Sequence, residues 1–236
     1  MTIKIAAFKR LTTFVATLLA SLILVGFWTG NIQNGAAQQL DRAAMNNQAG
    51  LMKFLLFLGT DPNVKIDSSW YCATGNSLII SHHYPLHTAA GEGGLEATQI
   101  LLEHGAQVNA TNEAGNTALW YAALYGRADI ARLLLARGAE MNSASLEEAA
   151  EEGETEIVKL LLENDAGKNL NVDSALYKAV LFDRADTARF LMSKGANLKF
   201  AERKLAPTIN SEDSAQDIRD SITALIKMLN HSEVKK

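Results

Sequence analysis

The sequence predicts an all-α protein in which pairs of short helices stack into a solenoid. One phrase recurs in phase along the chain: a pair of small residues, a turn, a Leu-rich triplet, a Gly-Ala-like pair and Asn. Hydrophobic residues make up 48% of the 236 residues and charged residues 20%, which excludes a fully disordered chain. Only three residues are proline, which argues against a Pro-rich linker protein. Repetition of one helical unit is typical of solenoids.

Net charge and cysteine content exclude several classes of protein. The formal charge is −4, so no general electrostatic attraction for nucleic acid is expected. Cys72 is the single cysteine, which excludes an internal disulfide and a Cys-rich zinc module. We therefore expect no nucleic-acid partner.

The N-terminal segment has the pattern of an export or anchoring signal. Lys4, Lys9 and Arg10 precede residues 11–28, which carry no charge. As a helix, these eighteen residues would span about 27 Å, close to the ~30 Å hydrocarbon core of a bilayer. Positive charge before the apolar run orients the N-terminus inward, so the chain from about residue 30 onward would be exported.

Two interpretations of this segment remain open. Residues 1–37 could be a signal peptide cleaved after the small residues Gly35, Ala36 and Ala37. They could instead form an uncleaved signal anchor, because eighteen residues is long for a signal core. In that case membrane contact would occur only through residues 11–28. Both interpretations predict an envelope protein that is periplasmic, or anchored in the inner membrane and facing the periplasm, if the source is bacterial.

The repeats occupy residues 38–199. The two clearest copies are residues 85–109 and 118–142, which stand 33 residues apart. Three weaker copies are residues 40–63, 146–169 and 176–199. One copy cannot bury its own apolar face, so the five copies are expected to stack against one another.

The second copy reads PLHTAAGEGGLEATQILLEHGAQVN and resembles the ankyrin repeat. The third copy keeps Thr117 and Leu119 but has Ala118 and Trp120 where the family usually has Pro and His. The resemblance implies helix-turn-helix units with short hairpin fingers. It also implies a protein-binding scaffold with no catalysis and no cofactor. His87 occupies the position of the family's structural histidine, which bonds to backbone in the adjoining loop.

Residue types within each copy suit this architecture. Small alanines on the first helix allow close approach of neighbouring helices, and leucines on the second helix fill the shared core. Gly105, Gly138 and Gly195 suit the left-handed turn that ends a second helix.

The spacing between copies is uneven. Residues 64–84 form an insertion that is apolar for a loop, and residues 77–81 could form a strand of a hairpin. The insertion either folds back over the first two repeats or projects as a recognition finger. The fingers after repeats three and four are expected to be stunted.

The C-terminal part, residues 200–236, contains a predicted loose connector at 200–213 and a helix at 214–229. The helix has an apolar stripe at helical spacing. We expect it to cover the end of the solenoid, and the alternative is a partner-binding helix.

The best candidate site is the concave face, where ankyrin partners usually contact the fingers and the outward positions of each first helix. By repeat phase, repeat two presents Thr88, Gly91 and Glu92 there. The predicted protein-binding positions in repeats three to five are Trp120, Tyr121, Leu124, Tyr125, Glu148, Glu151, Glu152, Lys178, Leu181 and Phe182. Exposed aromatic residues are typical anchors of protein interfaces, although these rings could instead pack internally. The partner is expected to be another protein, and the chain a monomer.

Repeat four is strongly acidic. Ser145 and Glu148 have the spacing of a capping box, which would use part of this acid to start a helix. The rest is either a solvated face or a patch that attracts a basic partner. A basic partner suggests an alternative function: an inhibitor or immunity-type protein that neutralises an envelope-acting toxin.

No motif for chemistry stands out. His82, His83 and His87 lie near Cys72, but their spacing matches no standard zinc module. The sequence contains no evident catalytic triad, phosphate loop or carboxylate pair. We therefore expect no enzyme activity, no metal site and no cofactor.

Overall fold

The computed structural model describes residues 32–71, 78–164, 170–209 and 216–233. The predicted apolar helix at residues 11–28 lies outside these ranges. Among the described residues, no helix is both long enough and apolar enough to cross a bilayer.

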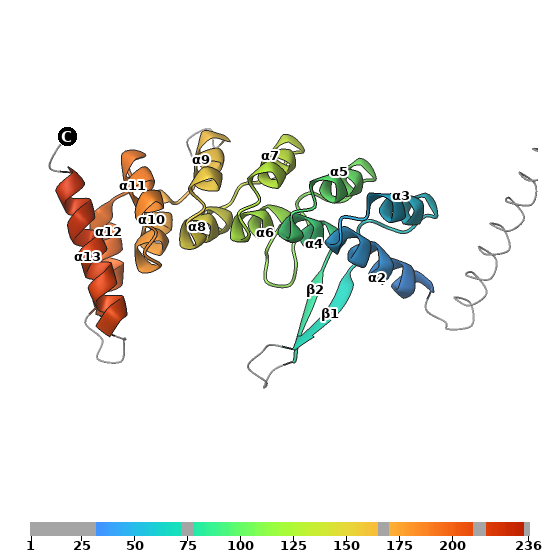
Figure 1. Ribbon diagram of the computed structural model, residues 1–236, viewed down its shortest axis with the longest axis horizontal. Coiled ribbons are helices and arrows are strands. Elements are labelled where there is room, and N and C mark those ends of the chain that lie inside the picture. The colour runs from blue at the N-terminus through green and yellow to red at the C-terminus, as the bar shows by residue number, and fades with distance from the viewer. Residues whose placement is uncertain (1–31, 72–77, 165–169, 210–215, 234–236) are drawn as a thin grey trace, which may run out of the picture.

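Five helix pairs stack side by side (Figure 1). The first helices form one row and the second helices form the other. The pairs are α2 (Ile32–Met45) with α3 (Ala49–Phe57), α4 (Pro85–Glu92) with α5 (Leu95–Glu103), α6 (Ala118–Leu124) with α7 (Ala128–Ala136), α8 (Ser143–Glu152) with α9 (Thr155–Asn164), and α10 (Val172–Leu181) with α11 (Ala185–Ser193).

The predicted small-residue pairs form the centre of the core. Their members are fully buried in every repeat: Ala43 and Ala44, Ala89 and Ala90, Ala122 and Ala123, Ala149 and Ala150, Ala179 and Val180. Each first helix contacts the next one, from α2 through α4, α6 and α8 to α10. Small side chains permit this close spacing, and the leucines of the second helices close the core behind them.

The predicted glycine turns are confirmed. Gly105, Gly138 and Gly195 have φ values of 87°, 86° and 97°. This left-handed region favours glycine because it has no Cβ.

The described part of the chain is helical, as expected, and the insertion adds one two-stranded sheet close to the hairpin strand predicted at residues 77–81. Strands β1 (Ile66–Tyr71) and β2 (Leu78–His83) pair antiparallel, with Ile66 opposite His83 and Tyr71 opposite Leu78. The hairpin projects away from the helix rows on the side of the first helices (Figure 1). It therefore does not fold back over repeats one and two.

A buried polar cluster holds the base of this hairpin. Ile66 is buried, and the Nε2 atom of His83 lies 3.3 Å from Oδ1 of Asp41 on α2. Thr88 of α4 donates a hydrogen bond of 2.6 Å to the same oxygen. The insertion is thus fixed to both repeat one and repeat two.

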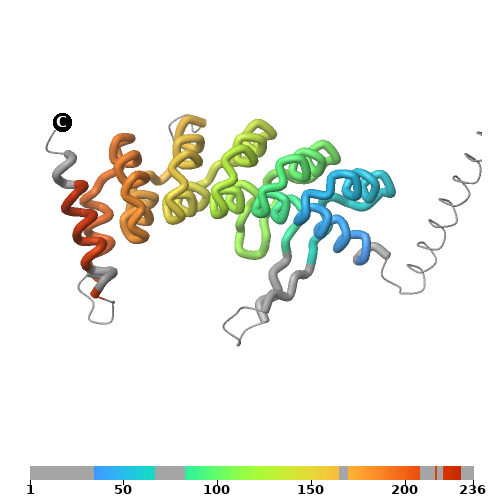
Figure 2. Tube along the Cα trace, viewed as in Figure 1, coloured from blue at the N-terminus to red at the C-terminus, as the bar shows by residue number. Residues whose placement is uncertain are grey.

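The C-terminal end also differs from the expectation. Much of the predicted loose connector is helix α12 (Leu198–Ile209), in which Leu198, Ala201 and Leu205 are buried. Helix α13 (Gln216–Glu233) packs on α12 and α10 and buries Ile222 and Leu225. The two helices close the end of the solenoid opposite α2 and α3 (Figure 2).

Asparagine side chains join successive repeats. Asn63 donates to the carbonyl of Gly105 (2.9 Å) and accepts from the amide of Gln107 (2.7 Å). Asn109 repeats this pattern with Gly138 (3.2 Å) and Glu140 (2.8 Å).

Asn142, the third asparagine at this repeat phase, does not join two repeats. Asn142 accepts from the amide of Ser145 at 2.9 Å and so caps α8. The predicted capping box at Ser145 and Glu148 is therefore wrong, because α8 begins at Ser143 and Ser145 lies within its first turn.

Candidate functional site: the face of the first helices

The C-terminal ends of the first helices, including their C-cap residues, carry a row of alternating acid and aromatic residues. Glu92, Tyr125, Glu152 and Phe182 occupy the same repeat phase and are all exposed. Tyr125 and Phe182 expose 53% and 41% of their surface. We call the surface formed by α6, α8 and α10 around this row the first-helix surface.

Tyr125 rests on the preceding repeat. A Cβ placed on Gly91 would lie 3.2 Å from the Tyr125 ring, so the ring lies against that glycine. One side of the ring is therefore supported and the other faces solvent. A side chain held in this way loses little conformational freedom when a partner binds.

Tyr121 and Trp120 are partly internal. The Tyr121 ring stacks on His87 with centroids 5.3 Å apart, and its hydroxyl accepts a hydrogen bond of 3.0 Å from Asn112. Burial raises the pKa of Tyr121. Trp120 meets Tyr121 edge to face at 5.1 Å. The internal-packing interpretation therefore applies to Trp120 and Tyr121, which pack between repeats. The interface-anchor interpretation applies to Tyr125, which points outward.

His87 bonds to backbone as the resemblance implied. Its Nε2 lies 2.9 Å from the carbonyl oxygen of Ala110, and the side chain is 1% exposed. Burial, the largest cause, lowers the pKa of His87 to about 4. The imidazole is therefore neutral at neutral pH.

Repeats three and four are linked by Trp120 and Glu148. The indole donates a hydrogen bond to the Glu148 carboxylate, and this bond lowers the pKa of that group. Burial and the charge of Glu151 act in the opposite direction and prevail, so the pKa of Glu148 is raised.

The acid of repeat four is partly neutralised by repeat five. Lys178 Nζ lies 2.6 Å from Glu151 Oε2, and this bond raises the pKa of Lys178. Arg184 lies 3.7 Å from Glu152. Lys178 also lies over the Phe182 ring, 5.7 Å from its centroid. Two of the acidic positions that could attract a basic partner are therefore already paired.

The remaining positions have supporting roles. Leu124 and Leu181 are half-buried beside the exposed aromatics, and Leu181 packs against the core. Thr88 is occupied by its bond to Asp41.

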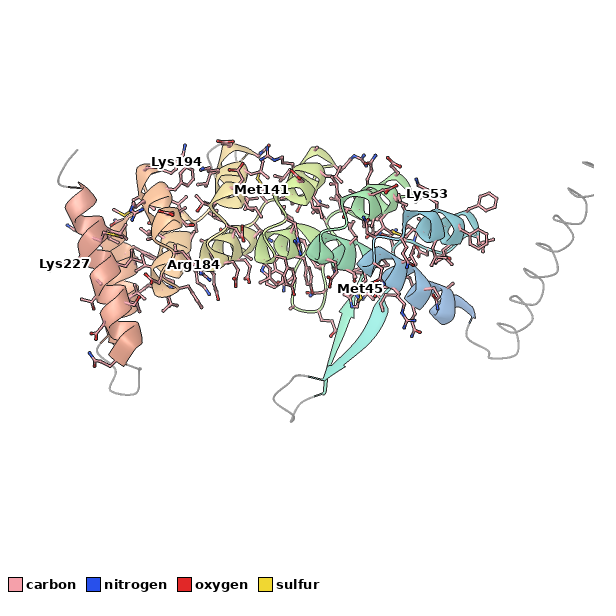
Figure 3. All side chains as sticks on the ribbon, viewed as in Figure 1. Met45, Lys53, Met141, Arg184, Lys194 and Lys227 are labelled. Atoms are coloured by element: carbon pink, nitrogen blue, oxygen red, sulfur yellow. The ribbon has the colours of Figure 1, made fainter. Side chains whose placement is uncertain are left out.

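Two arginines that were absent from the sequence-based site contact the preceding repeat. Arg127 Nε donates to the carbonyl of Gly91 at 3.1 Å. Arg184 Nε donates to the carbonyl of Glu151 at 2.7 Å, between α8 and α10 (Figure 3). Their identical repeat phase, directly after Gly126 and Asp183, was the available signal.

No group of three or more His, Cys, Asp or Glu residues suited to a metal ion occurs among the described residues. The side chains of Cys72 and His82 lie outside that description.

A family model described as ankyrin repeats, in three copies, matches residues 40–145. The match covers the first three of the five repeats described above. Similar curated proteins include a transient receptor potential cation channel subfamily A member 1 homolog of Caenorhabditis elegans, 34% identical over 135 residues. The potassium channel AKT2/3 of Arabidopsis thaliana is 32% identical over 125 residues.

These alignments cover 52% and 48% of this chain, but only 11% and 15% of the two channels. The likeness is thus to a small part of each channel. Among solved structures, the human ASB11 ankyrin repeat domain superposes with a TM-score of 0.56 at 24% identity. The superposition covers 79% of this chain and 82% of that domain, which confirms the ankyrin-repeat solenoid fold.

Proposed function

We propose that the chain is an exported ankyrin-repeat scaffold that binds another protein through its first-helix surface, in the cell envelope and without catalysis. Ankyrin repeats generally serve protein–protein interaction, which agrees with the matched repeats. The observation that carries the proposal is the pair of exposed rings, Tyr125 and Phe182. Such rings on a rigid surface are typical interface anchors, and truncating a hot spot costs about 2 kcal/mol or more.

The two rings stand two repeats apart. At about 10 Å per packed helix, their separation is roughly 20 Å. A partner would present two apolar contacts at this distance, with polar groups between them near Glu152. Because Glu151 and Glu152 already pair with Lys178 and Arg184, the apolar anchors support binding more strongly than a basic partner does. The toxin-neutralising alternative gains no support from these ion pairs.

Retention of the N-terminal segment is the better-supported of the two export interpretations. Helix α2 begins at Ile32, so cleavage after Ala37 would cut inside it. Ala37 is itself 3% exposed and belongs to the buried core. We therefore propose that residues 11–28 remain as a membrane tether and that the repeats act as a monomer on the exported side. N-terminal sequencing of the purified chain tests this: an intact start supports retention, and a chain beginning at Gln38 contradicts it.

Crosslinking capture from cell envelopes tests the binding surface. The full chain is compared with a double variant, Tyr125→Ala with Phe182→Ala. Leu95→Ala is the matched control, because Leu95 is 44% exposed but lies on α5, away from the first-helix surface. We expect one specific protein to be captured by the wild type and the control and lost by the double variant. Equal capture by all three would refute the proposed surface.

A further inference from the structure

We propose that the exposed face of α3 rests on a lipid bilayer, the one in which residues 11–28 would be inserted. This inference builds on the membrane tether proposed above. It concerns four residues, which we call the α3 apolar patch: Leu51, Phe54, Phe57 and Leu58. They expose 39%, 43%, 85% and 56% of their surface.

Part of the patch follows from its position at the end of the stack. Leu51 and Phe54 stand 46 residues before Ala97 and Ile100, which are buried in a helix that contacts α3. Among the described residues, no repeat precedes α3 to cover the same face. A terminal repeat normally needs a polar outer surface here, so an apolar face indicates an apolar neighbour.

Repeat packing does not explain the other two residues. At the phase of Phe57 the later repeats have small or polar residues, namely Glu103, Ala136, Glu163 and Ser193. At the phase of Leu58 all four are polar, namely His104, Arg137, Asn164 and Lys194. Repeat one alone places large apolar groups at these two exposed positions, which extends the patch beyond any stacking surface.

The patch lies at the same end of the molecule as the start of α2. A short turn at residues 46–48 joins α2 to α3, and such connections place helices antiparallel. Nine residues of α3 rise about 13 Å and fourteen residues of α2 about 21 Å. The end of α3 therefore lies about 8 Å, along the axis, from the first residue of α2. Residues 29–31, the link to the apolar run, reach at most about 10 Å.

Lipid is a better neighbour for this patch than residues 11–28 themselves. Those residues carry no charge, so packing on α3 would cover one side of a helix and leave most of its apolar side chains in water. An uncharged helix of this length suits the hydrocarbon core of a bilayer. With the run in the bilayer and a three-residue link, the α3 apolar patch lies within reach of the membrane surface. Apolar groups of this kind enter the interface by about 5–10 Å.

Quenching by spin-labelled lipid tests this placement on the full chain. In a Cys72→Ser background, a fluorescent label is attached at Phe57→Cys or, as the matched control, at Glu103→Cys one repeat later. The protein is reconstituted in phosphatidylcholine–phosphatidylglycerol vesicles that carry a shallow nitroxide. We expect quenching at position 57 to exceed that at position 103 by at least about twofold, given the insertion depth above.

A second variant separates lipid contact from a folding defect. Phe57→Glu with Leu58→His introduces the two residues that α5 carries at the same phase, so the solenoid should remain intact by circular dichroism. A label at Leu51→Cys should then lose its excess quenching. Persistent quenching of that label would overturn the proposal.

Three other outcomes would also overturn it, and each identifies a different failure. Equal quenching at positions 57 and 103 in vesicle-bound protein would mean that the tether holds but α3 faces water. Failure of the chain to float with vesicles would remove the tether and the patch proposal together. Disulfide-linked dimers at Phe57→Cys without quenching would show that a second copy covers the patch. The capture experiment with the Tyr125 and Phe182 variant tests the protein-binding surface independently of the lipid contact.

Discussion

The Nε atom of Arg184 donates a hydrogen bond of 2.7 Å to the backbone carbonyl of Glu151, one repeat earlier. The arginine side chain crosses Gly153 to reach it, and a Cβ on that glycine would lie 2.9 Å from Arg184 Cδ. Because Gly153 also has a φ of 82°, this joint between repeats four and five requires glycine twice, for backbone conformation and for space.

Gly153→Ala should therefore destabilise the protein more than Gly138→Ala. Both positions have left-handed backbone, which costs a residue with a Cβ about 1–2 kcal/mol. Gly138 has nothing within 4 Å of an added Cβ, so it isolates the backbone cost. Gly153→Ala additionally displaces Arg184 and should lose about 1 kcal/mol more, the net value of one hydrogen bond. Urea unfolding measures the difference, and equal losses would mean that the Arg184 contact contributes nothing.

Protonation of His87 should weaken the fold in mild acid. The folded protein holds the pKa of His87 at about 4, against 6.5 in an unfolded chain. The unfolded chain therefore binds a proton first as the pH falls, and stability is complete above 6.5 and declines toward 4. The expected loss is about 2 kcal/mol by pH 5 and about 3 by pH 4.

The His87→Gln variant provides the control for this pH dependence. Glutamine can still donate to the Ala110 carbonyl but does not titrate. Urea unfolding between pH 7 and pH 5 should show a shallower decline in the variant, and identical declines would contradict the assignment to His87.

Replacing Glu148 by Gln should leave stability unchanged or raise it slightly at neutral pH. Burial and Glu151 raise the pKa of Glu148, so its charge is unfavourable in the folded state. Its ionised form therefore costs stability above the folded pKa, and this cost disappears as the pH falls through that value. Glutamine keeps an acceptor for the Trp120 indole. Thermal unfolding at pH 7 checks the sign, and a marked loss would show that the carboxylate charge is needed.

Asn109→Ala should cost about 1–2 kcal/mol, because Asn109 makes two hydrogen bonds to the backbone of the next repeat. Asn164 is the matched control, since its described bond stays within its own helix, to Leu160. Asn164→Ala should change stability by less. Chemical unfolding of the two variants makes the comparison, and similar costs would argue against the inter-repeat role.

Repeat phase predicted most of the fold because stacking places equivalent residues in equivalent surroundings. The buried pairs such as Ala122 and Ala123, the glycine turns and the backbone bond of His87 all followed from it. Helix α12 was missed because most of it, including the buried Ala201 and Leu205, follows the last repeat, where phase no longer applies.

The side chains of the site were less predictable. Phase gave their helix positions but not their partners, which depend on how far one repeat is offset from the next. The contact between Trp120 and Glu148 and the pairing of Glu151 with Lys178 arise from that offset. The exposed state of Tyr125 was expected, whereas the partly internal state of Tyr121 depends on the proximity of His87.

The altered use of Asn142 has a mechanical consequence. Asn63 and Asn109 tie their repeats to the next turn, and Arg127 and Arg184 reach back to the previous helix. At the junction between repeats three and four, Asn142 caps its own helix and Glu154 occupies the arginine position. Trp120 with Glu148 and the exposed ion pair of Arg132 with Glu156 still join these repeats. Without the two backbone ties, we expect the solenoid to bend more readily there than between repeats four and five, with faster amide exchange at the start of α8 than at the start of α10. This joint lies between Tyr125 and Phe182, so its flexing would set the distance between the two rings and let the scaffold adjust its span to a partner.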